Sequence, residues 1–331
     1  MDMVCFAAVF LVASFAHLSI ATALPPLTAV QRQLIWQTPQ DEEPKVRATV
    51  KKENENQHFL TCDEWHLDLF EPKLRGIGGA YAGVGTDQGY LFIGWMRPEI
   101  AWMTDYDPSV ALMHEIYAAF FNEAVDAPKF YALWSHRKVA REVLQRRLEQ
   151  HPKRAEIIAM FDEWQVRVLR RFDRMRYFFN KTKVKTFLDD AEQYSYVRDL
   201  VMAGRVRPML VNLLESKGMI GIAAASRKLN VPLRALYLSN AEDYWAYPKQ
   251  FKDNIAAQFF DDKSWIVRTA ATKPKNGDYR YNLQAATVMQ AAMARPNVRR
   301  PVAMVPWVEI TERDQFPLVI VGLDGKGKIY P

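Results

Sequence analysis

The chain has 331 residues, of which 49% are hydrophobic and 12% aromatic, so it can bury a large core and is not a disordered protein. Its formal net charge of +6 is unevenly placed, because residues 129–185 hold 16 Lys/Arg against 6 Asp/Glu, a net of +10, which leaves −4 for the rest. Cys5 and Cys62 are the only cysteines, and Cys5 lies in an apolar N-terminal run, so a disulfide framework is excluded.

Residues 1–23 are predicted to form a signal peptide or a membrane anchor. The apolar run ends on Ala21-Thr22-Ala23, a small-x-small cleavage pattern that is followed by Leu24 and two prolines. The first three residues carry no Lys or Arg, and a run of about 20 apolar residues is also long enough to stay in the bilayer. We therefore expect a protein that is exported (periplasmic) or anchored through its N-terminus, with an internal buried helix as the alternative.

Residues 24–62 are predicted to be a linker, because prolines combine with the polar runs QDEE and KKENENQ. Residues 27–36 within it form a short amphipathic pattern, which we expect to dock on the body as a helix. The folded domain is expected to cover residues 63–331.

The domain begins with a strand, AYAGVG, and a helix that starts after Thr86 and ends before Pro98. Arg97 is expected to cap that helix, although it could instead face the glycine turn. The run EIAWMT predicts a second buried strand. Asp107 is expected to cap the next helix, with Pro108 in its first turn.

A basic helical insertion is predicted over about residues 129–190. Its apolar residues recur every three or four positions from Ile157 to Phe179, which predicts a long amphipathic helix. Its arginines are expected to lie mostly off the apolar stripe: Arg167, Arg170, Arg171, Arg174 and Arg176. We interpret the pattern as core packing with a solvated arginine face. This face could also bind an anionic membrane surface or an acidic partner, whereas nucleic acid is a less favoured partner for an exported chain.

The alternation of strands and helices then resumes. The remaining expected elements are a helix over 191–202, a strand over 205–211, a helix over 216–229, a strand over 233–238, a helix over 248–259, a strand over 264–271, a helix over 282–294 and a strand over 317–323. Strands that alternate with helices at this spacing predict an α/β fold with a doubly wound, mostly parallel, Rossmann-like sheet.

Polar and glycine residues follow three of the predicted strands. Such residues gather at one edge of a parallel sheet, where ligands bind near the switch in strand order. The first strand leads into a turn that lets backbone approach a ligand, and the second ends on an acidic residue suited to ribose hydroxyls. The candidate cofactor-binding residues are Gly83, Gly85, Thr86, Gln88 and Asp105, and the candidate catalytic residues are Asp87, Asn240 and Glu242.

The motifs GVGTDQGYLFIGWMRP and YLSNAEDYW resemble those of an uncharacterised bacterial family that is similar in fold to class I S-adenosylmethionine-dependent methyltransferases. The resemblance covers residues from about 63 to the C-terminus. It implies that Gly83 and Gly85 lie under the methionine part of S-adenosylmethionine, that Asp105 binds the ribose, and that Asn240 stands in the catalytic loop. An acidic residue before the glycine turn and an Asn-Pro-Pro-Tyr motif, which such enzymes often carry, are absent from the sequence.

Two functions therefore stay open. The first is nucleoside-cofactor binding, with methyl transfer to an unknown acceptor. An exported enzyme, however, would lack this cytoplasmic methyl donor, so the second is a non-enzymatic envelope protein that interacts through the basic insertion.

Asp105-Tyr106-Asp107 could also form a D-x-D metal site for a nucleotide-sugar transferase. His114 is expected to be a hydrogen-bonded helix histidine and Cys62 a packed thiol, and motifs for zinc peptidases, serine hydrolases and P-loop ATPases are absent.

Overall fold

The computed structural model describes residues 24–46, 56–270 and 275–330. The signal peptide or anchor predicted for residues 1–23 lies outside these residues. Within the described ranges, no helix is both long and apolar enough to cross a membrane.

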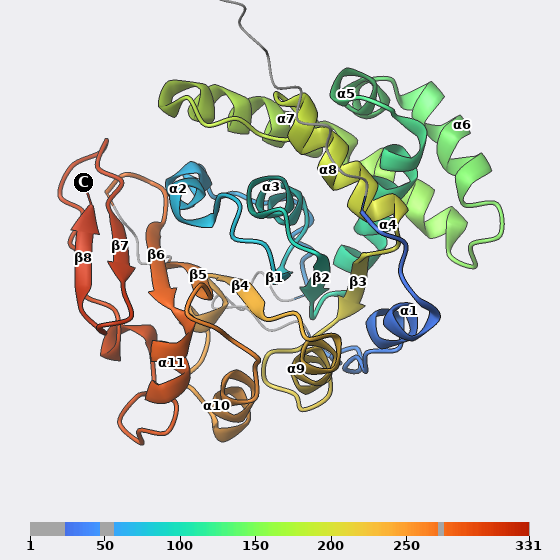
Figure 1. The fold of residues 1–331 in the computed structure, drawn as a ribbon. Coiled ribbons are helices and arrows are strands. Elements are labelled where there is room, and N and C mark those ends of the chain that lie inside the picture. Colours follow the sequence, from blue (N-terminus) through green and yellow to red (C-terminus); the bar gives the residue numbers. More distant parts are fainter. Residues whose placement is uncertain (1–23, 47–55, 271–274, 331) are drawn as a thin grey trace, which may run out of the picture.

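An eight-stranded mixed sheet forms the centre of the molecule, in the order β3-β2-β1-β4-β5-β6-β7-β8 (Figure 1). The strands are β1 (Ala80–Val84), β2 (Ile100–Asp105), β3 (Val206–Leu210), β4 (Leu233–Ser239), β5 (Trp265–Ala270), β6 (Arg280–Ala285), β7 (Leu318–Val321) and β8 (Gly327–Tyr330). The first five strands are parallel, β6 is antiparallel to β5, β7 is parallel to β6, and β8 is antiparallel to β7. The α/β prediction with a mostly parallel, Rossmann-like sheet is thereby confirmed.

Helices cover both faces of the sheet (Figure 1). One face carries α2 (Glu71–Leu74), α3 (Asp87–Met96), α4 (Pro108–Glu123), α5 (Ala127–Ser135), α6 (Arg137–Arg147), α7 (Arg154–Thr182) and α8 (Ala191–Met202). The other carries α1 (Ala29–Trp36), α9 (Gly218–Leu229), α10 (Lys249–Ala256) and α11 (Ala286–Ala292). Short 3₁₀ turns are η2 (Leu67–Phe70), η3 (Ala241–Asp243) and η4 (Pro301–Ala303).

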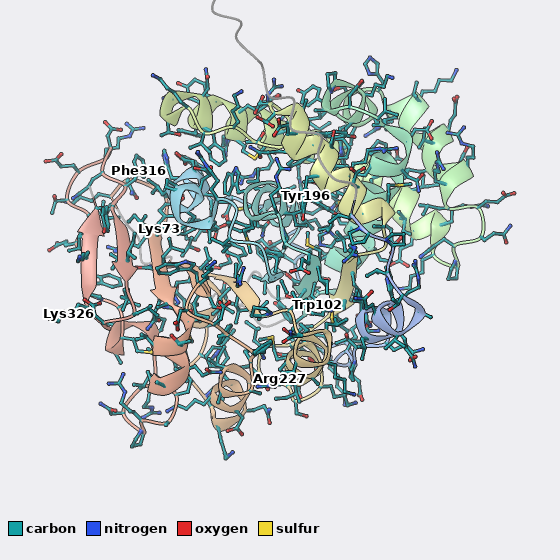
Figure 2. All side chains as sticks on the ribbon, viewed as in Figure 1. Lys73, Trp102, Tyr196, Arg227, Phe316 and Lys326 are labelled. Atoms are coloured by element: carbon teal, nitrogen blue, oxygen red, sulfur yellow. The ribbon has the colours of Figure 1, made fainter. Side chains whose placement is uncertain are left out.

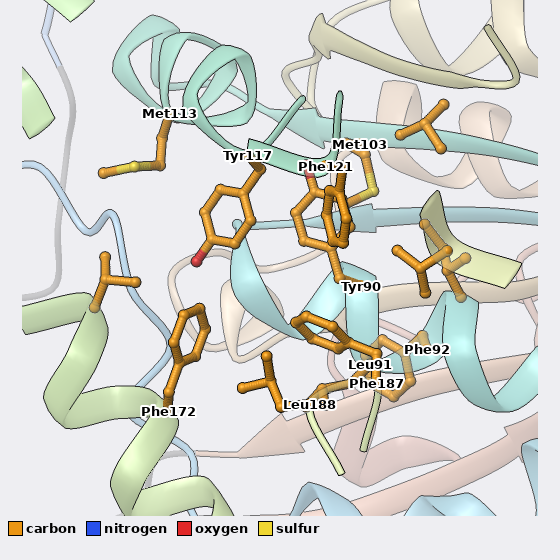
Figure 3. Packing of buried hydrophobic residues seen from close by; sticks show 14 of the residues in the cluster. Tyr90, Leu91, Phe92, Met103, Met113, Tyr117, Phe121, Phe172, Phe187 and Leu188 are labelled. Atoms are coloured by element: carbon orange, nitrogen blue, oxygen red, sulfur yellow. The ribbon is translucent and has the colours of Figure 1, made fainter. Parts of the chain in front are cut away.

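Two hydrophobic cores lie on the two faces, because successive side chains of a strand point to opposite sides. Tyr81 of β1 belongs to the core under α3, α4 and α7, whereas Ala80 and Ala82 belong to the core over α9 and α10. The larger core is aromatic, and the rings of Tyr90 and Tyr117 stack at 4.7 Å in its centre (Figure 3). Side chains fill the space between the sheet and both helical layers (Figure 2).

Local signals set several element boundaries as predicted. Asp107 accepts a hydrogen bond from Ser109 N at 2.9 Å and so caps α4. Arg97 adopts a left-handed conformation, with φ of 55°, and ends α3 before Pro98. The basic segment holds the long amphipathic helix α7.

The C-terminal part of the sheet differs from the prediction. Residues 282–285, expected to begin a helix, are the end of β6, and α11 starts only at Ala286. β8 was not predicted at all. Both strands owe their conformation to pairing with neighbours, β6 with β5 and β7, and β8 with β7.

Candidate functional site

The turn after β1 requires glycine and is closed by a side chain from its own helix. Gly85 has φ of +85°, and a Cβ there would lie 1.9 Å from Gln88 Nε2. The Gln88 amide donates to Val84 O at 3.0 Å and accepts from Thr86 N at 3.1 Å. The space into which a ligand would approach the backbone is therefore filled by Gln88.

Gly83 has a different role from Gly85. It lies within β1, paired with Met103 and Tyr237 of the flanking strands. A Cβ at Gly83 would lie 2.1 Å from the hydroxyl oxygen of Tyr81, so glycine here makes room for that phenol. The buried Tyr81 hydroxyl makes no hydrogen bond to the part of the chain that the structure describes.

Asp105 lies beside the turn, at the end of β2. Its two carboxylate oxygens accept from Gly85 N and from Asp107 N, each at 3.0 Å. The residue is partly exposed, and burial raises the pKa of its carboxyl group to about 7. Asp107 caps α4 and contacts His58 Nδ1 at 2.8 Å, so its carboxylate oxygens are both used in contacts within the fold. The described residues contain no cluster of three or more His, Cys, Asp or Glu side chains that could hold a metal ion.

Residues 58–64, which we call the covering segment, lie over the glycine turn. Thr86 Oγ1 donates to Leu60 O at 2.8 Å, and Asp87 Oδ1 accepts from Cys62 N at 2.8 Å. The hydrogen bonds at the start of α3 are therefore made to the covering segment.

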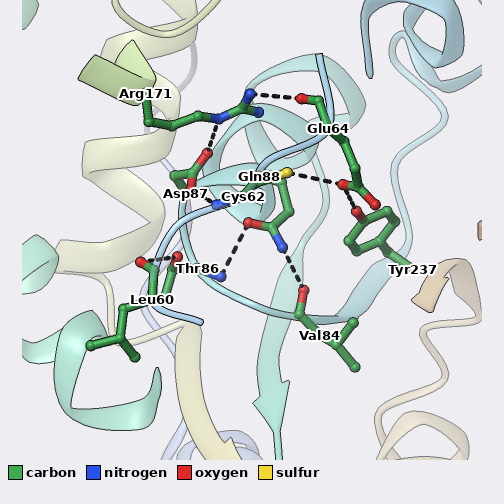
Figure 4. A network of polar contacts seen from close by, with 9 residues as sticks. All are labelled: Leu60, Cys62, Glu64, Val84, Thr86, Asp87, Gln88, Arg171 and Tyr237. Carbon is green, nitrogen blue, oxygen red and sulfur yellow. Dashed lines mark hydrogen bonds and ion pairs between the residues drawn. The ribbon is translucent and has the colours of Figure 1, made fainter. Parts of the chain in front are cut away.

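Arg171 of α7 completes this network (Figure 4). Its Nε donates to Asp87 Oδ2 at 2.8 Å and its Nη1 donates to Glu64 O at 2.6 Å. The side chains of Asp87 and Arg171 are only 1% and 3% exposed. The expectation of a solvated arginine face was therefore wrong for Arg171, which is buried on the apolar side of α7.

Glu64, at the end of the covering segment, is a buried carboxylate at the carboxyl ends of β4 and β5. It accepts from Thr269 Oγ1 at 2.6 Å and from Ser239 Oγ at 2.8 Å, and also from the hydroxyl of Tyr237. The Cys62 thiol donates to it at 2.9 Å. Burial raises the pKa of Glu64, and the hydrogen bonds oppose that shift. Burial also raises the pKa of Cys62, which keeps it a thiol.

The two other acidic or polar candidates at β4 lie apart from Asp87. Asn240 is partly exposed and follows Ser239, whose φ is +51°. Glu242 is buried and bonds Arg268 Nε at 2.6 Å and the hydroxyl of Tyr247. Since Arg268 also contacts Met289 of α11, Glu242 is directed to the face opposite Asp87.

His114 of α4 is a hydrogen-bonded core histidine, as expected. Its Nδ1 lies 3.0 Å from the Tyr90 hydroxyl and its Nε2 lies 3.1 Å from Gly85 O. Because a carbonyl can only accept, we assign the ring proton to Nε2. Burial lowers the pKa of His114 to about 4, so the neutral ring is stable.

The structure thus brings Gly83, Gly85, Thr86, Gln88 and Asp105 together around one turn. Asp87 lies beneath the covering segment, Asn240 at the neighbouring strand end, and Glu242 across the sheet. Sequence reasoning missed Glu64 and Arg171. For Arg171 a signal existed, since it lies three residues after Val168 and four before Met175 of the apolar stripe. No local sequence signal marked Glu64, because its partner Thr269 is 205 residues away along the chain.

Comparison with known proteins places the chain in a family but adds no activity. No curated protein matches the chain significantly. Residues 59–318, which run from the covering segment to β7, match one family along their whole length. The chain therefore belongs to the family described as a domain of unknown function, DUF7790.

Proposed function

We propose that this protein binds a nucleoside cofactor at the turn between β1 and α3, with S-adenosylmethionine as the first candidate. The observation that carries the proposal is the position of Asp105. Its carboxylate lies against the Gly85 turn, at the carboxyl ends of β1 and β2. In the order β3-β2-β1-β4-β5, strands β2 and β3 are added on one side of β1 and strands β4 and β5 on the other, and α/β sheets bind ligands at such a switch in strand order.

Asp105 retains the capacity to bind a ribose hydroxyl. A carboxylate has about four acceptor positions, and the backbone N–H groups of Gly85, Asp107 and Tyr106 take up to three of them. The remaining position suits one hydroxyl of a ribose. Asp105 and Gly85 are partly exposed and provide the approach, whereas Thr86 and Gln88 are buried.

Binding requires a local rearrangement of Gln88. Its amide occupies the interior of the turn, which is where the methionine part of the cofactor is expected to lie. Rotation of this side chain frees Thr86 N and Val84 O for a ligand. Methyl transfer to an acceptor placed near Asn240 is the reaction implied by the resemblance to methyltransferases. Asp87 and Glu242, held in buried ion pairs, are better explained as structural residues.

The alternative, an exported or anchored envelope protein that acts through its basic helices, has less support from the contacts. Several arginines of α6 are paired within the fold: Arg141 binds Asp162 at 2.6 Å and Arg147 binds Glu123 at 2.9 Å. A topology reporter fused after Pro331 tests it. A domain on the cytoplasmic side has access to S-adenosylmethionine, whereas one on the outer side favours the alternative.

The cofactor proposal is tested by thermal shift and calorimetry on the full chain with S-adenosylmethionine, S-adenosylhomocysteine and NAD. A ligand at about 100 times its Kd stabilises the folded state by about 2.7 kcal/mol. We expect stabilisation by the two S-adenosyl compounds, at least tenfold weaker binding in Asp105→Asn, and tighter binding in Gln88→Ala.

Asp314→Asn, which removes an exposed carboxylate elsewhere, is the matched control and should bind like the unmodified chain. Absence of stabilisation by every nucleoside at millimolar concentration rejects the proposal. Unchanged affinity in Asp105→Asn rejects the assignment of the ribose.

A further inference from the structure

The outer side of α7 carries a row of cations, and Figure 1 shows this helix on the outside of its layer. Residues three and four positions apart lie on one side of a helix. The residues that follow this spacing are Arg167, Arg170, Arg174, Tyr177 and Lys181, and all of them are exposed. The row, which we call the basic stripe, is about 21 Å long at 1.5 Å per residue. It points away from the sheet, because the buried stripe occupies the opposite side of α7.

The basic stripe keeps an excess of positive charge after all printed pairs are counted. Within the residues that the structure describes, its four cations form no ion pair, whereas Arg171 and Arg176 of the same helix do. Residues 163–183 hold seven Lys/Arg, so five remain when those two are set aside. Against these five stand Glu163 and Asp173, which leaves a net charge of +3. The outer side of α7 therefore attracts anions.

Three of the four cations lie over aromatic rings. The distances from the charged group to the ring centre are 4.4 Å for Arg167 and Trp164, 5.3 Å for Arg174 and Trp65, and 4.3 Å for Lys181 and Tyr177. A cation over a ring keeps its charge, while its aliphatic stem covers apolar surface. Cations that are already held in place lose less freedom when they bind a partner.

The described chain begins on the same side of the sheet as the basic stripe. Leu24, its first residue, packs against the core under α3, α4 and α7. Pro25 O accepts from Arg205 Nη2 at 2.6 Å, which fixes this segment beside the start of β3. Residues 1–23, which the sequence predicts to be a signal peptide or a membrane anchor, therefore join the domain on the side that carries the stripe.

We propose that the basic stripe binds the anionic headgroups of a phospholipid membrane. Its cations lie on one side of one helix, so a flat anionic surface reaches all of them together. Lysine, arginine and tyrosine are also the residues that stand at membrane interfaces. The apolar side of α7 is buried in the core, so the contact is made with headgroups and does not insert the helix into the bilayer. This inference does not depend on the nucleoside site.

Single-stranded nucleic acid fits the stripe less well. Such a partner needs open aromatic faces on which its bases stack. The rings of Trp65 and Tyr177 each have a cation over them, and Phe178 stacks on Trp65 at 5.4 Å. The stripe therefore offers charge along its length but little open ring surface.

The test is arginine footprinting of the full chain with vesicles, because it reports on the stripe even if residues 1–23 enter the bilayer. Phenylglyoxal labels exposed arginines, and mass spectrometry gives the labelling rate of each. Vesicles of phosphatidylcholine alone are compared with vesicles of equal parts of phosphatidylcholine and phosphatidylglycerol. We expect Arg167, Arg170 and Arg174 to be labelled at least tenfold more slowly with the anionic vesicles, and this protection to vanish in molar salt. Arg295 and Arg299, which follow α11 in the opposite layer, should be labelled equally fast with both.

A pair of variants locates the contact. Arg170→Gln removes a central charge of the stripe and should lower the protection of Arg167 and Arg174 about fivefold, the effect of one cation near an anionic surface. Lys228→Gln removes an exposed charge from α9, on the other face of the sheet, and should leave the protection unchanged.

Three results would overturn the proposal. The first is equal labelling of the stripe arginines with both kinds of vesicle at millimolar lipid. The second is equal protection of Arg295 and Arg299, and the third is the same effect of Arg170→Gln and Lys228→Gln. A single-stranded oligonucleotide that protects the stripe more strongly than the anionic vesicles, at the same phosphate concentration, would assign it to nucleic acid instead.

Discussion

Two titratable side chains hold the backbone N–H and C=O groups of Gly85. Its N–H donates to Asp105, and its C=O lies against His114 Nε2. Burial raises the pKa of Asp105 from 3.8 to about 7 and lowers that of His114 from 6.5 to about 4. Both shifts favour the neutral form of the side chain in the folded protein. Burial at this turn therefore disfavours the charged forms of both Asp105 and His114. The two pKa shifts nevertheless change the stability of the fold with pH in opposite directions.

The pH dependence of stability follows from those signs. Between pH 3.8 and about 7 the folded state binds the Asp105 proton that the unfolded state has lost, so the free energy of unfolding falls as the pH rises. Between about pH 4 and 6.5 the unfolded state binds the His114 proton that the folded state excludes, so the free energy of unfolding rises with pH. The free energy of unfolding of Asp105→Asn, minus that of the unmodified chain, should therefore increase between pH 3.8 and about 7. The same difference for His114→Gln should decrease between about pH 4 and 6.5. Urea unfolding at successive pH values measures both slopes.

The slopes matter here and not the absolute values, since each substitution also removes hydrogen bonds. Each variant is thus compared with the unmodified chain at every pH. Curves that run parallel to that of the unmodified chain would show that the environment of Gly85 does not shift these groups.

At the scale of elements, one ion pair attaches α7 to the turn and to the covering segment. Asp87 begins α3, Arg171 lies within α7, and Arg171 also binds Glu64 O. Both side chains are almost fully buried, so removal of one leaves the other as an uncompensated buried charge. Such a loss costs about 3–5 kcal/mol.

Arg171→Met is therefore expected to lower the free energy of unfolding by about 3–5 kcal/mol, measured by denaturant unfolding. Arg170→Met, at the exposed neighbouring position, is the control and should remain close to the unmodified chain. The double variant Asp87→Asn/Arg171→Met contains neither buried charge. Its decrease in the free energy of unfolding should consequently be smaller than the sum of the decreases in the two single variants. Additive losses would mean that the two side chains do not interact.

Elements with local signals were predictable from the sequence, whereas those set by distant partners were not. The presence of α7 and the residue range of α8 follow from apolar spacing, and the five parallel strands follow from their apolar runs. β6 was mistaken for helix because its Asn282 and Gln284 break the apolar pattern and alanines follow them. Those polar side chains are buried by pairing and packing that no local pattern encodes. In the candidate site, likewise, Gly85 and Asp105 could be placed from the sequence, but the covering segment and its anchor Glu64 could not.

At the scale of the whole molecule, the described N-terminal residues connect the edge strand β3 to the helical layer that contains α9. Trp36 Nε1 donates to Gly204 O at 2.8 Å, and Arg207 Nη1 donates to Ile35 O at 2.6 Å. Beyond α1, the buried Asp41 accepts from the backbone N–H groups of Asn212, Lys217 and Gly218 at 3.0, 3.0 and 3.1 Å. The N-terminus of α9 is thus capped by a residue more than 170 positions earlier in the chain.

Asp41→Ala should accordingly destabilise the whole domain and not only its N-terminal segment. The substitution leaves three backbone donors without their acceptor and removes a negative charge from a helix N-terminus, so we expect a loss of about 2 kcal/mol or more in the free energy of unfolding. Glu42→Ala is the control: Glu42 pairs with Lys217 at 2.8 Å, but its side chain is 87% exposed, so its removal should change stability little. Hydrogen exchange distinguishes local from global effects. If Asp41 couples the layers, amides of α9 and of β3 exchange faster in Asp41→Ala along with those of α1. Faster exchange confined to α1 would show that the N-terminal segment docks on a domain that is complete without it.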